Sequence, residues 1–162
     1  MNNINIQVEK DDAIKFLDEI SGVVQKAKAF ALRKGANIIK KQTQSSFSST
    51  GINDNQNSKY SDRLIDGIRT TSLKDDDTIG VHILGSKAKT SGTYRLRFFE
   101  KGTKERFAKT YKGQPLKKKR RLGKIKSYKF FESAVNTSRS NAEQTVIEQL
   151  TKYIDNAWNK YN

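Results

Sequence analysis

One apolar stripe of helical period, from Ile14 to Ile38, constrains the fold of this chain more than any other feature. Its members recur mostly at intervals of three or four residues: Ile14, Leu17, Ile20, Val24, Ala27, Ala31 and Ile38. Asp11 or Asp12 can cap the first turn, and basic residues gather late, where the helix dipole favours cations. The pattern predicts one helix over residues 12–43, roughly 45–50 Å long at 1.5 Å per residue.

Shorter patterns around this helix predict a small sheet and a second helix. Residues 3–8 alternate between apolar and polar side chains, which is typical of a half-buried strand. Three more strand-like runs, over 68–73, 78–84 and 93–100, are separated by short polar connections and predict an antiparallel meander. A helical stripe that begins near Asn141 predicts a closing helix.

The order of these elements predicts an α+β fold with a long N-terminal helix and a C-terminal helix packed on a small antiparallel sheet. The length of 162 residues suits a single domain, 1–162. Residues 42–63 are rich in serine, asparagine and glutamine, and they predict a polar loop between the first helix and the sheet.

The positive charge of the chain is concentrated in one segment. Between Lys101 and Lys129 there are 13 basic residues and one acid, Glu105, so this segment carries +12 of the formal net charge of +15. Adjacent cations repel one another and require an anion, either phosphate or a carboxylate-bearing surface. The sequence therefore predicts a long, poorly ordered basic loop over 101–127 when the protein is alone.

The densest part of this loop leaves three interpretations open: a solvated loop, a contact with nucleic acid, or a contact with an acidic protein. Lysine and arginine neutralise phosphate without reading base sequence, and no zinc finger, helix-turn-helix or RNP-type pattern is present, so any DNA contact should be sequence-independent. The candidate contact residues for nucleic acid or an acidic partner are Lys112, Lys117, Lys118, Lys119, Arg120, Arg121, Lys124 and Lys126.

Aromatic residues are interleaved with these cations. Such rings can stack on single-stranded bases. They can also be core residues at strand and helix ends, and this interpretation is favoured because Phe98 and Phe131 lie on apolar faces already assigned. The interleaved set is Phe98, Phe99, Phe107, Tyr111, Tyr128, Phe130 and Phe131.

Nothing in the sequence supports an enzyme or a cofactor. The chain has no cysteine, and its one histidine, His82, lies in a predicted strand without a nucleophile or carboxylate placed beside it. The Asp75–Asp77 triplet lacks the glycine and glutamate spacing of a calcium loop and is expected to be a solvated turn. We therefore expect no catalytic, cofactor-binding or metal-binding residues. No apolar run approaches 18 residues, so no transmembrane helix and no membrane partner are expected.

Several short motifs occur in an order that resembles the head–tail joining, or tail-completion, proteins of tailed bacteriophages. After the long helix come Thr50-Gly51 and then Leu64-Ile65-Asp66-Gly67-Ile68, which matches the family's Leu-x-x-x-Ile step into the sheet. An aromatic-Glu-x-Gly-Thr step follows at Phe99–Thr103, and an aromatic-x-x-Ala start of the closing helix lies at Phe131–Ala134. The resemblance extends from about residue 12 to residue 160.

This resemblance implies a structural virion protein without catalysis or cofactor. Such a protein forms a homo-oligomeric ring, for example a hexamer, at the neck of the particle after synthesis in the host cytoplasm. Its implied partners are the phage portal or connector, the tail tube or terminator proteins, and genomic DNA in the channel without sequence specificity. The alternative is a free basic, sequence-independent nucleic-acid-binding accessory protein that uses the 101–129 segment.

Overall fold

The computed structural model describes residues 10–54, 61–72, 78–85, 91–111 and 114–159, except for the side chains of residues 10–19 and Trp158. In chain order, its elements are α1 (Lys10–Ser48), η1 (Leu64–Gly67), β1 (Arg69–Ser72), β2 (Ile79–His82), η2 (Thr93–Arg95), α2 (Leu96–Lys101), β3 (Arg106–Tyr111), β4 (Gln114–Gly123) and α3 (Phe130–Trp158). Two long helices and two small antiparallel sheets confirm the predicted α+β fold.

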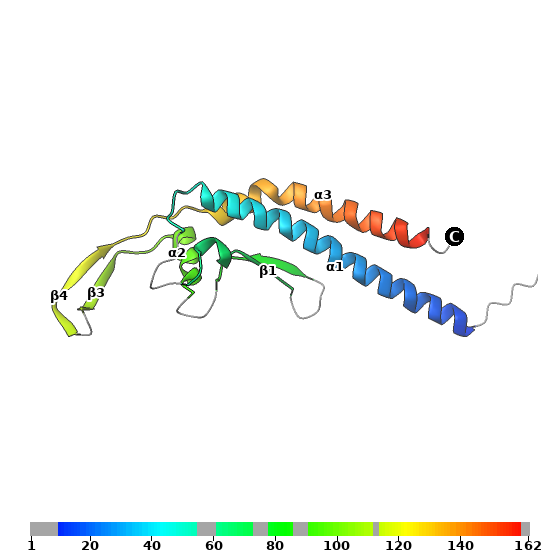
Figure 1. Cartoon of the computed structure of the whole chain (residues 1–162), viewed down its shortest axis with the longest axis horizontal. Helices are drawn as coiled ribbons and strands as arrows, with labels where there is room; N and C mark the ends of the chain where they lie inside the picture. The colour runs from blue at the N-terminus through cyan, green and yellow to red at the C-terminus, as the bar shows by residue number, and fades with distance from the viewer. Residues whose placement is uncertain (1–9, 55–60, 73–77, 86–90, 112–113, 160–162) are drawn as a thin grey trace, which may run out of the picture.

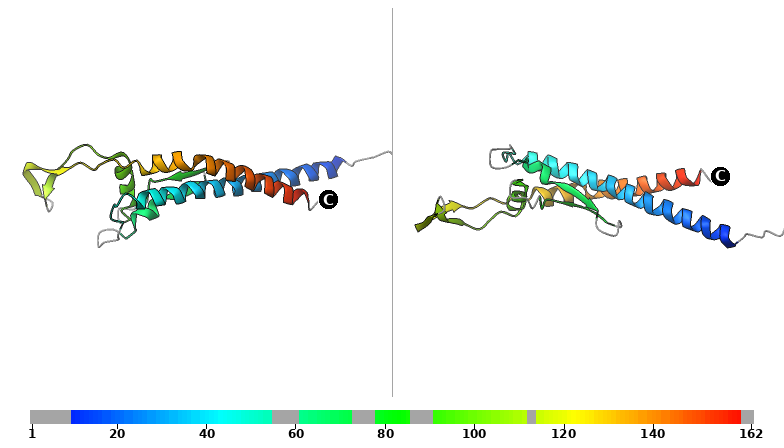
Figure 2. Two further views of the ribbon diagram at one scale, coloured as in Figure 1. Left: turned by 90° about the horizontal axis from the view of Figure 1, so that it is seen from above. Right: turned by 60° about the horizontal axis from the view of Figure 1, so that its bottom comes forward.

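Helices α1 and α3 lie side by side and antiparallel, and they form the long axis of the molecule (Figures 1 and 2). Small side chains permit this close approach. A Cβ atom added at Gly35 would lie 2.5 Å from Val146 Cγ2 and 3.1 Å from the Ala142 carbonyl oxygen. Buried small residues recur every four positions on each facing surface: Ala27, Ala31 and Gly35 on α1, and Ala134, Ser138 and Ala142 on α3.

The largest buried side chains gather where the end of α1 meets the start of α3. Phe47 and Phe130 meet edge to face, with ring centroids 5.2 Å apart. Leu64 of η1, Ile68 and Leu96 of α2 complete this cluster, and each is at most 1% exposed. Phe131 of the aromatic-x-x-Ala segment packs against this cluster and is partly buried, so this segment and the Leu-x-x-x-Ile step contribute to one core.

The sheet that packs against the helices has two strands. Strands β1 and β2 pair antiparallel, from Arg69 opposite His82 to Ser72 opposite Ile79, and they lie against α1 (Figure 1). The predicted third strand over 93–100 is wrong, because this segment forms η2 and α2. Its buried positions, Thr93, Leu96 and Glu100, follow the three- and four-residue spacing of a helix rather than the alternation of a strand.

Both long helices extend further than predicted. Helix α1 continues through Ser48, so the polar loop over 42–63 is wrong for its first seven residues. Thr43 and Phe47 are buried there, and the Thr43 hydroxyl donates to the Ile39 carbonyl over 2.8 Å. Helix α3 begins at Phe130, well before the predicted start at Asn141, because a side chain from α2 caps it, as described below. The strand predicted over 3–8 lies outside the described residues.

Candidate functional site

The basic segment is not a loop but a β-hairpin, which we call the arm (β3 and β4). The predicted loop over 101–127 is therefore corrected: antiparallel pairing runs from Arg106 opposite Gly123 to Tyr111 opposite Gln114. The arm projects from one end of the helix pair (Figure 1). The segment can form a hairpin despite its charge because its cationic side chains are exposed to solvent while the two backbones pair.

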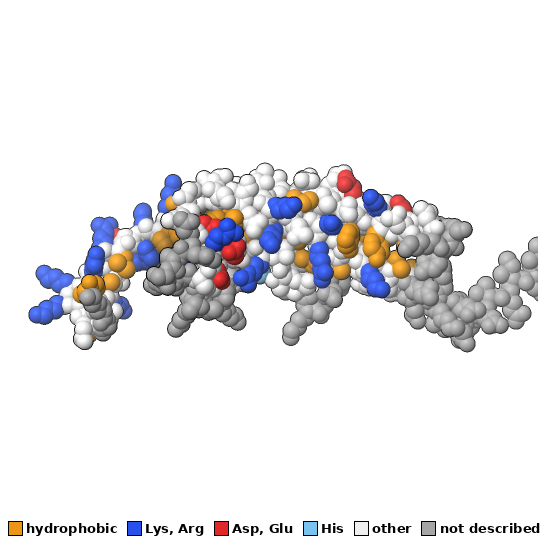
Figure 3. Space-filling view, viewed as in Figure 1, with side chains coloured by type: hydrophobic (Ala, Val, Ile, Leu, Met, Phe, Trp, Pro, Cys, Tyr) orange, Lys and Arg blue, Asp and Glu red, His pale blue; other side chains and the backbone are white. Residues whose placement is uncertain are grey.

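The cationic run lies at an irregular part of β4. Ala108 pairs with Arg120 and Thr110 with Pro115, so the four residues 116–119 stand opposite Lys109 alone. Such a bulge bends a strand and re-aims its side chains. Figure 3 shows basic side chains gathered over the arm. Of the predicted contact residues, those that the structure describes are all exposed: Lys117, Lys118, Lys119, Arg120, Arg121, Lys124 and Lys126. Lys112 lies outside the described residues.

Four cations line a hollow at the base of the arm, and two of them were not among the predicted contact residues. This hollow of about 610 Å³ is lined by backbone and side chains from both sides of the base. Its basic members are Lys101, Lys104, Lys124 and Lys126. Lys101 and Lys104 escaped prediction because they meet Lys124 and Lys126 only when Thr103 pairs with Ile125, 22 residues away.

The arm is anchored by the Glu-x-Gly-Thr residues. Both carboxylate oxygens of Glu100 accept hydrogen bonds from the first turn of α3, at 2.8 Å from the Phe131 amide and 3.0 Å from the Glu132 amide. The N-cap residue of α3, Lys129, makes no side-chain hydrogen bond to the helix. The buried Glu100 carboxylate, 8% exposed, takes this capping role instead. Gly102 adopts φ +73°, which favours glycine, and the Thr103 hydroxyl accepts from the Ile125 amide at 2.9 Å.

The acids near the arm are already engaged, which leaves most of its charge without a partner among the described residues. Glu105 pairs with Arg121, and Glu132 pairs with Lys129 at 3.3 Å. Both carboxylate oxygens of Glu100 accept hydrogen bonds from backbone amides of α3. Within the ranges that the structure describes, no ion pair involves Lys117, Lys118, Lys119 or Arg120. The arm therefore presents a dense positive field that an external anion can neutralise.

The aromatic residues divide between core and surface. Phe130 is buried, as the core interpretation requires. For the arm that interpretation is wrong: Phe107 is 48% and Tyr111 58% exposed, and Tyr128 at its base is 39% exposed. Phe107 lies on a two-stranded hairpin, which has no second layer of its own for the ring to pack against. The exposed ring of Phe107 is thus available beside the cations.

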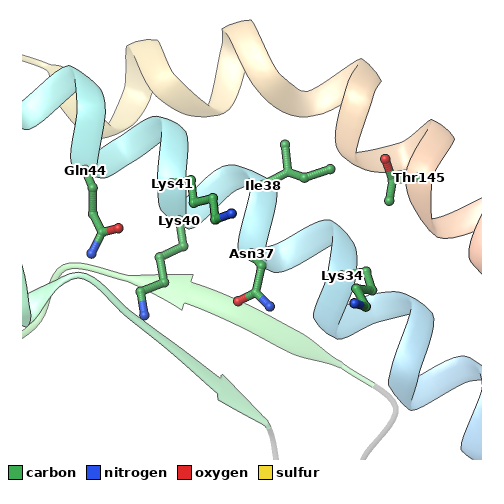
Figure 4. Close-up of a pocket in the computed structure, with 7 residues that line it drawn as sticks. All are labelled: Lys34, Asn37, Ile38, Lys40, Lys41, Gln44 and Thr145. Atoms are coloured by element: carbon green, nitrogen blue, oxygen red, sulfur yellow. The ribbon is translucent and has the colours of Figure 1, made fainter.

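A second basic surface lies on α1. Lys34, Lys40 and Lys41 line a hollow of about 460 Å³ together with Asn37 and other residues of α1, and Thr145 closes it from α3 (Figure 4). The Lys34 ammonium also lies 5.1 Å from the centre of the Phe30 ring. The sequence marked these lysines only as residues favoured by the helix dipole.

His82 and Asp62 make separate contacts in the described part of the chain. His82 Nε2 lies 2.8 Å from the Thr71 hydroxyl, a contact across the β1–β2 pair. The pKa of Asp62 is lowered by hydrogen bonds from the Ser91 and Ser61 hydroxyls. The bond from Ser91 joins the segment before η1 to the segment before η2. Within the described ranges, no group of three or more potential metal ligands occurs. The Asp75–Asp77 triplet lies outside them.

No helix in the described part of the chain is both long and apolar enough to cross a membrane. No known protein family, curated protein or solved structure matches this chain.

Proposed function

We propose that this chain is a structural protein of the head–tail junction of a tailed bacteriophage, where copies of it form a ring around the DNA channel. The ordered set of motifs described above supports this role. Three of those motifs occupy positions that organise the fold: Leu64 and Ile68 in the core, Glu100 to Thr103 at the base of the arm, and Phe131 at the start of α3.

The observation that carries the proposal is the anchored cationic arm. A ring subunit must contact layers outside its own body, and an arm that leaves the helix pair at one end is suited to that task (Figure 1). Its unpaired cations require an anion from outside the chain, which DNA in the channel or an acidic neighbouring ring supplies. The protein acts here as a connector and needs no cofactor.

Deletion of the gene from the phage that encodes it tests the proposal. We expect filled heads and free tails that fail to join, or tails that end incorrectly, in electron micrographs of lysates. Supply of the intact protein in trans should restore plaque formation. Normal infectious particles without the protein, or its absence from purified virions, would refute the neck role.

The alternative of a free nucleic-acid-binding accessory protein has one observation in its favour. Phe107 is exposed on the same hairpin as the cations, and an exposed ring beside basic residues suits single-stranded bases. Fractionation separates the two roles: a neck protein sediments with assembled particles in a density gradient, whereas an accessory protein stays in the soluble fraction with free nucleic acid.

A further inference from the structure

An apolar groove opens between β2 and α3, with α1 as its floor. The groove has a volume of about 700 Å³. Leu32, Ala36 and Ile39 of α1 form the floor. The α3 wall is formed mainly by Val135, Val146 and Ile147, and it also contains Arg139 and Glu143, which pair with each other at 2.8 Å. Ile147 at the rim is 66% exposed. An apolar hollow with exposed aliphatic side chains favours an occupant that covers it.

The wall opposite α3 is the outer edge of a sheet. Ile79 and Val81 of β2 line the groove, and β2 pairs with β1 on its other side. In the part of the chain that the structure describes, this sheet has no third strand, so the backbone groups along the outer edge of β2 are open to a further strand. The groove thus combines an apolar surface with a strand-pairing edge, which is the arrangement used in β-strand addition.

The chain itself contains a segment with matching chemistry. In residues 3–8, Ile4, Ile6 and Val8 alternate with Asn3, Asn5 and Gln7. A strand with this pattern puts three aliphatic side chains on one face and polar amides on the other. We propose that residues 3–8 of a second copy add to the outer edge of β2 and fill the apolar groove.

The distance between this segment and the groove of its own chain indicates that the occupant comes from another copy. Along α1, Lys10 and Leu32 are separated by about 33 Å, since each helical residue advances 1.5 Å. Even fully extended, the six steps from Ile4 to Lys10 span only about 20 Å. The segment therefore cannot reach its own groove, but it can reach the groove of a neighbour.

This arrangement assigns different surfaces to the donor and the acceptor. Contacts of that kind are heterologous and generate a ring when the rotation between copies closes. The inference goes beyond the proposed function because it names the surface that joins copies, and it rests on that proposal only for the expectation of a closed ring.

Matched charge substitutions on the two faces of the segment test the donor. Ile6→Asp would place a carboxylate in the apolar groove, whereas Asn5→Asp adds the same charge to the polar face. Sedimentation of the purified proteins should show self-association of the wild type and of Asn5→Asp, and a roughly tenfold or greater loss of affinity for Ile6→Asp. A wild type that remains monomeric, or equal losses in both variants, would overturn the proposal.

The acceptor is tested with Ile147→Asp, whose exposed position makes folding insensitive to the change; circular dichroism verifies this. Alone, Ile6→Asp and Ile147→Asp should each stay monomeric. Mixed together, they retain one intact donor and one intact acceptor, so they should form dimers and nothing larger. Failure of the mixture to dimerise would count against a heterologous contact.

Cross-linking identifies the contact directly, because the chain has no cysteine of its own. A mixture of Ile6→Cys and Ile147→Cys should give a cross-linked dimer under oxidation, and a mixture of Asn5→Cys with Arg69→Cys, which lies on β1 away from the groove, should give much less. Equal yields would refute docking in the groove. These measurements use the purified protein alone, so their outcome does not depend on the gene deletion test of the neck role. Likewise, a failure of the groove contact would not change the result of the gene deletion.

Discussion

The helix pair and the arm differ in how tightly their side chains pack and in how much charge they expose. Along the helix pair, small side chains such as Gly35 and Ala142 bring the backbones together, and Phe47 and Phe130 are almost fully buried. The arm has exposed aromatics, a large bulge and a row of cations. Tight packing determines the stability of the first region, and charge determines the possible partners of the second. Substitutions of the same residue type in the two regions should therefore differ in outcome.

The largest difference is expected for phenylalanine. Phe47→Ala removes a ring that is 1% exposed and contacts Phe130, so the free energy of unfolding should fall by about 3–5 kcal/mol. Phe107→Ala removes a ring of the same size that is 48% exposed on the arm, and it should change stability by no more than about 0.5 kcal/mol. Urea denaturation of both variants measures this contrast; similar losses would show that the arm is packed like the body.

A smaller difference is expected for glutamate. Glu100→Ala leaves the Phe131 and Glu132 amides without their acceptor and should cost about 0.5–2 kcal/mol, the range for removal of a helix cap. Glu105→Ala removes an exposed partner of Arg121 and should cost less than about 1 kcal/mol. Thermal unfolding followed by circular dichroism separates them. If Glu105→Ala proves the more damaging change, the capping role assigned to Glu100 is incorrect.

Neutralising the cationic run should scarcely affect stability. Replacing residues 117–121 by glutamine removes exposed charges that repel one another, so the free energy of unfolding should shift by no more than about 0.5 kcal/mol. If the arm contacts DNA, binding should be independent of sequence and lose roughly 10³–10⁵ in affinity between 50 and 200 mM salt for six to ten phosphates. The variant should reduce the salt slope by about 0.9 for each phosphate that it no longer neutralises.

The lysines on α1 provide the control for this experiment. Lys34, Lys40 and Lys41 form the second basic surface, and their replacement by glutamine alters net charge without touching the arm. Fluorescence anisotropy with labelled DNA at several salt concentrations compares the two variants. A greater effect from the α1 variant would place the contact away from the arm, and binding that survives high salt would refute a purely electrostatic contact.

The smallest effect concerns local opening. A two-stranded hairpin without a packed face is marginally stable in water, so limited trypsin digestion should cut first within Lys117–Lys126. Mass spectrometry of the early fragments locates the cut. Earlier cleavage in the part of α1 over 26–41, which also contains several basic residues, would contradict the contrast between body and arm.

The periodicity of apolar residues predicted the long helices and the first sheet. The stripe of α1, the β1 and β2 strands and the existence of a C-terminal helix all follow from local patterns. The segment over 93–100 was misread because Tyr94, Leu96 and Phe98 alternate like a strand, whereas tertiary packing buries Thr93, Leu96 and Glu100. Burial of those three positions depends on neighbours distant in sequence.

Charge predicted the candidate contact region but not its form. The run Lys117–Arg121 is visible in any count of charges, and its exposure agrees with that count. The hairpin was missed because cation-rich strands lack an apolar face, which is the usual signal of a strand. The hollow at its base was missed because it depends on the Thr103–Ile125 pairing, which no local pattern reveals.

The hydrogen bonds at the base of the arm also connect the arm mechanically to α3. Glu100 connects to the Phe131 and Glu132 amides, while its carbonyl oxygen accepts from the Ser127 hydroxyl at 2.7 Å. Any tension applied at the tip of the arm must pass through this junction before it reaches the helix pair. A force on the arm would therefore act first on the hydrogen bonds between Glu100 and the first turn of α3, and only then on the contact between the helices around Gly35.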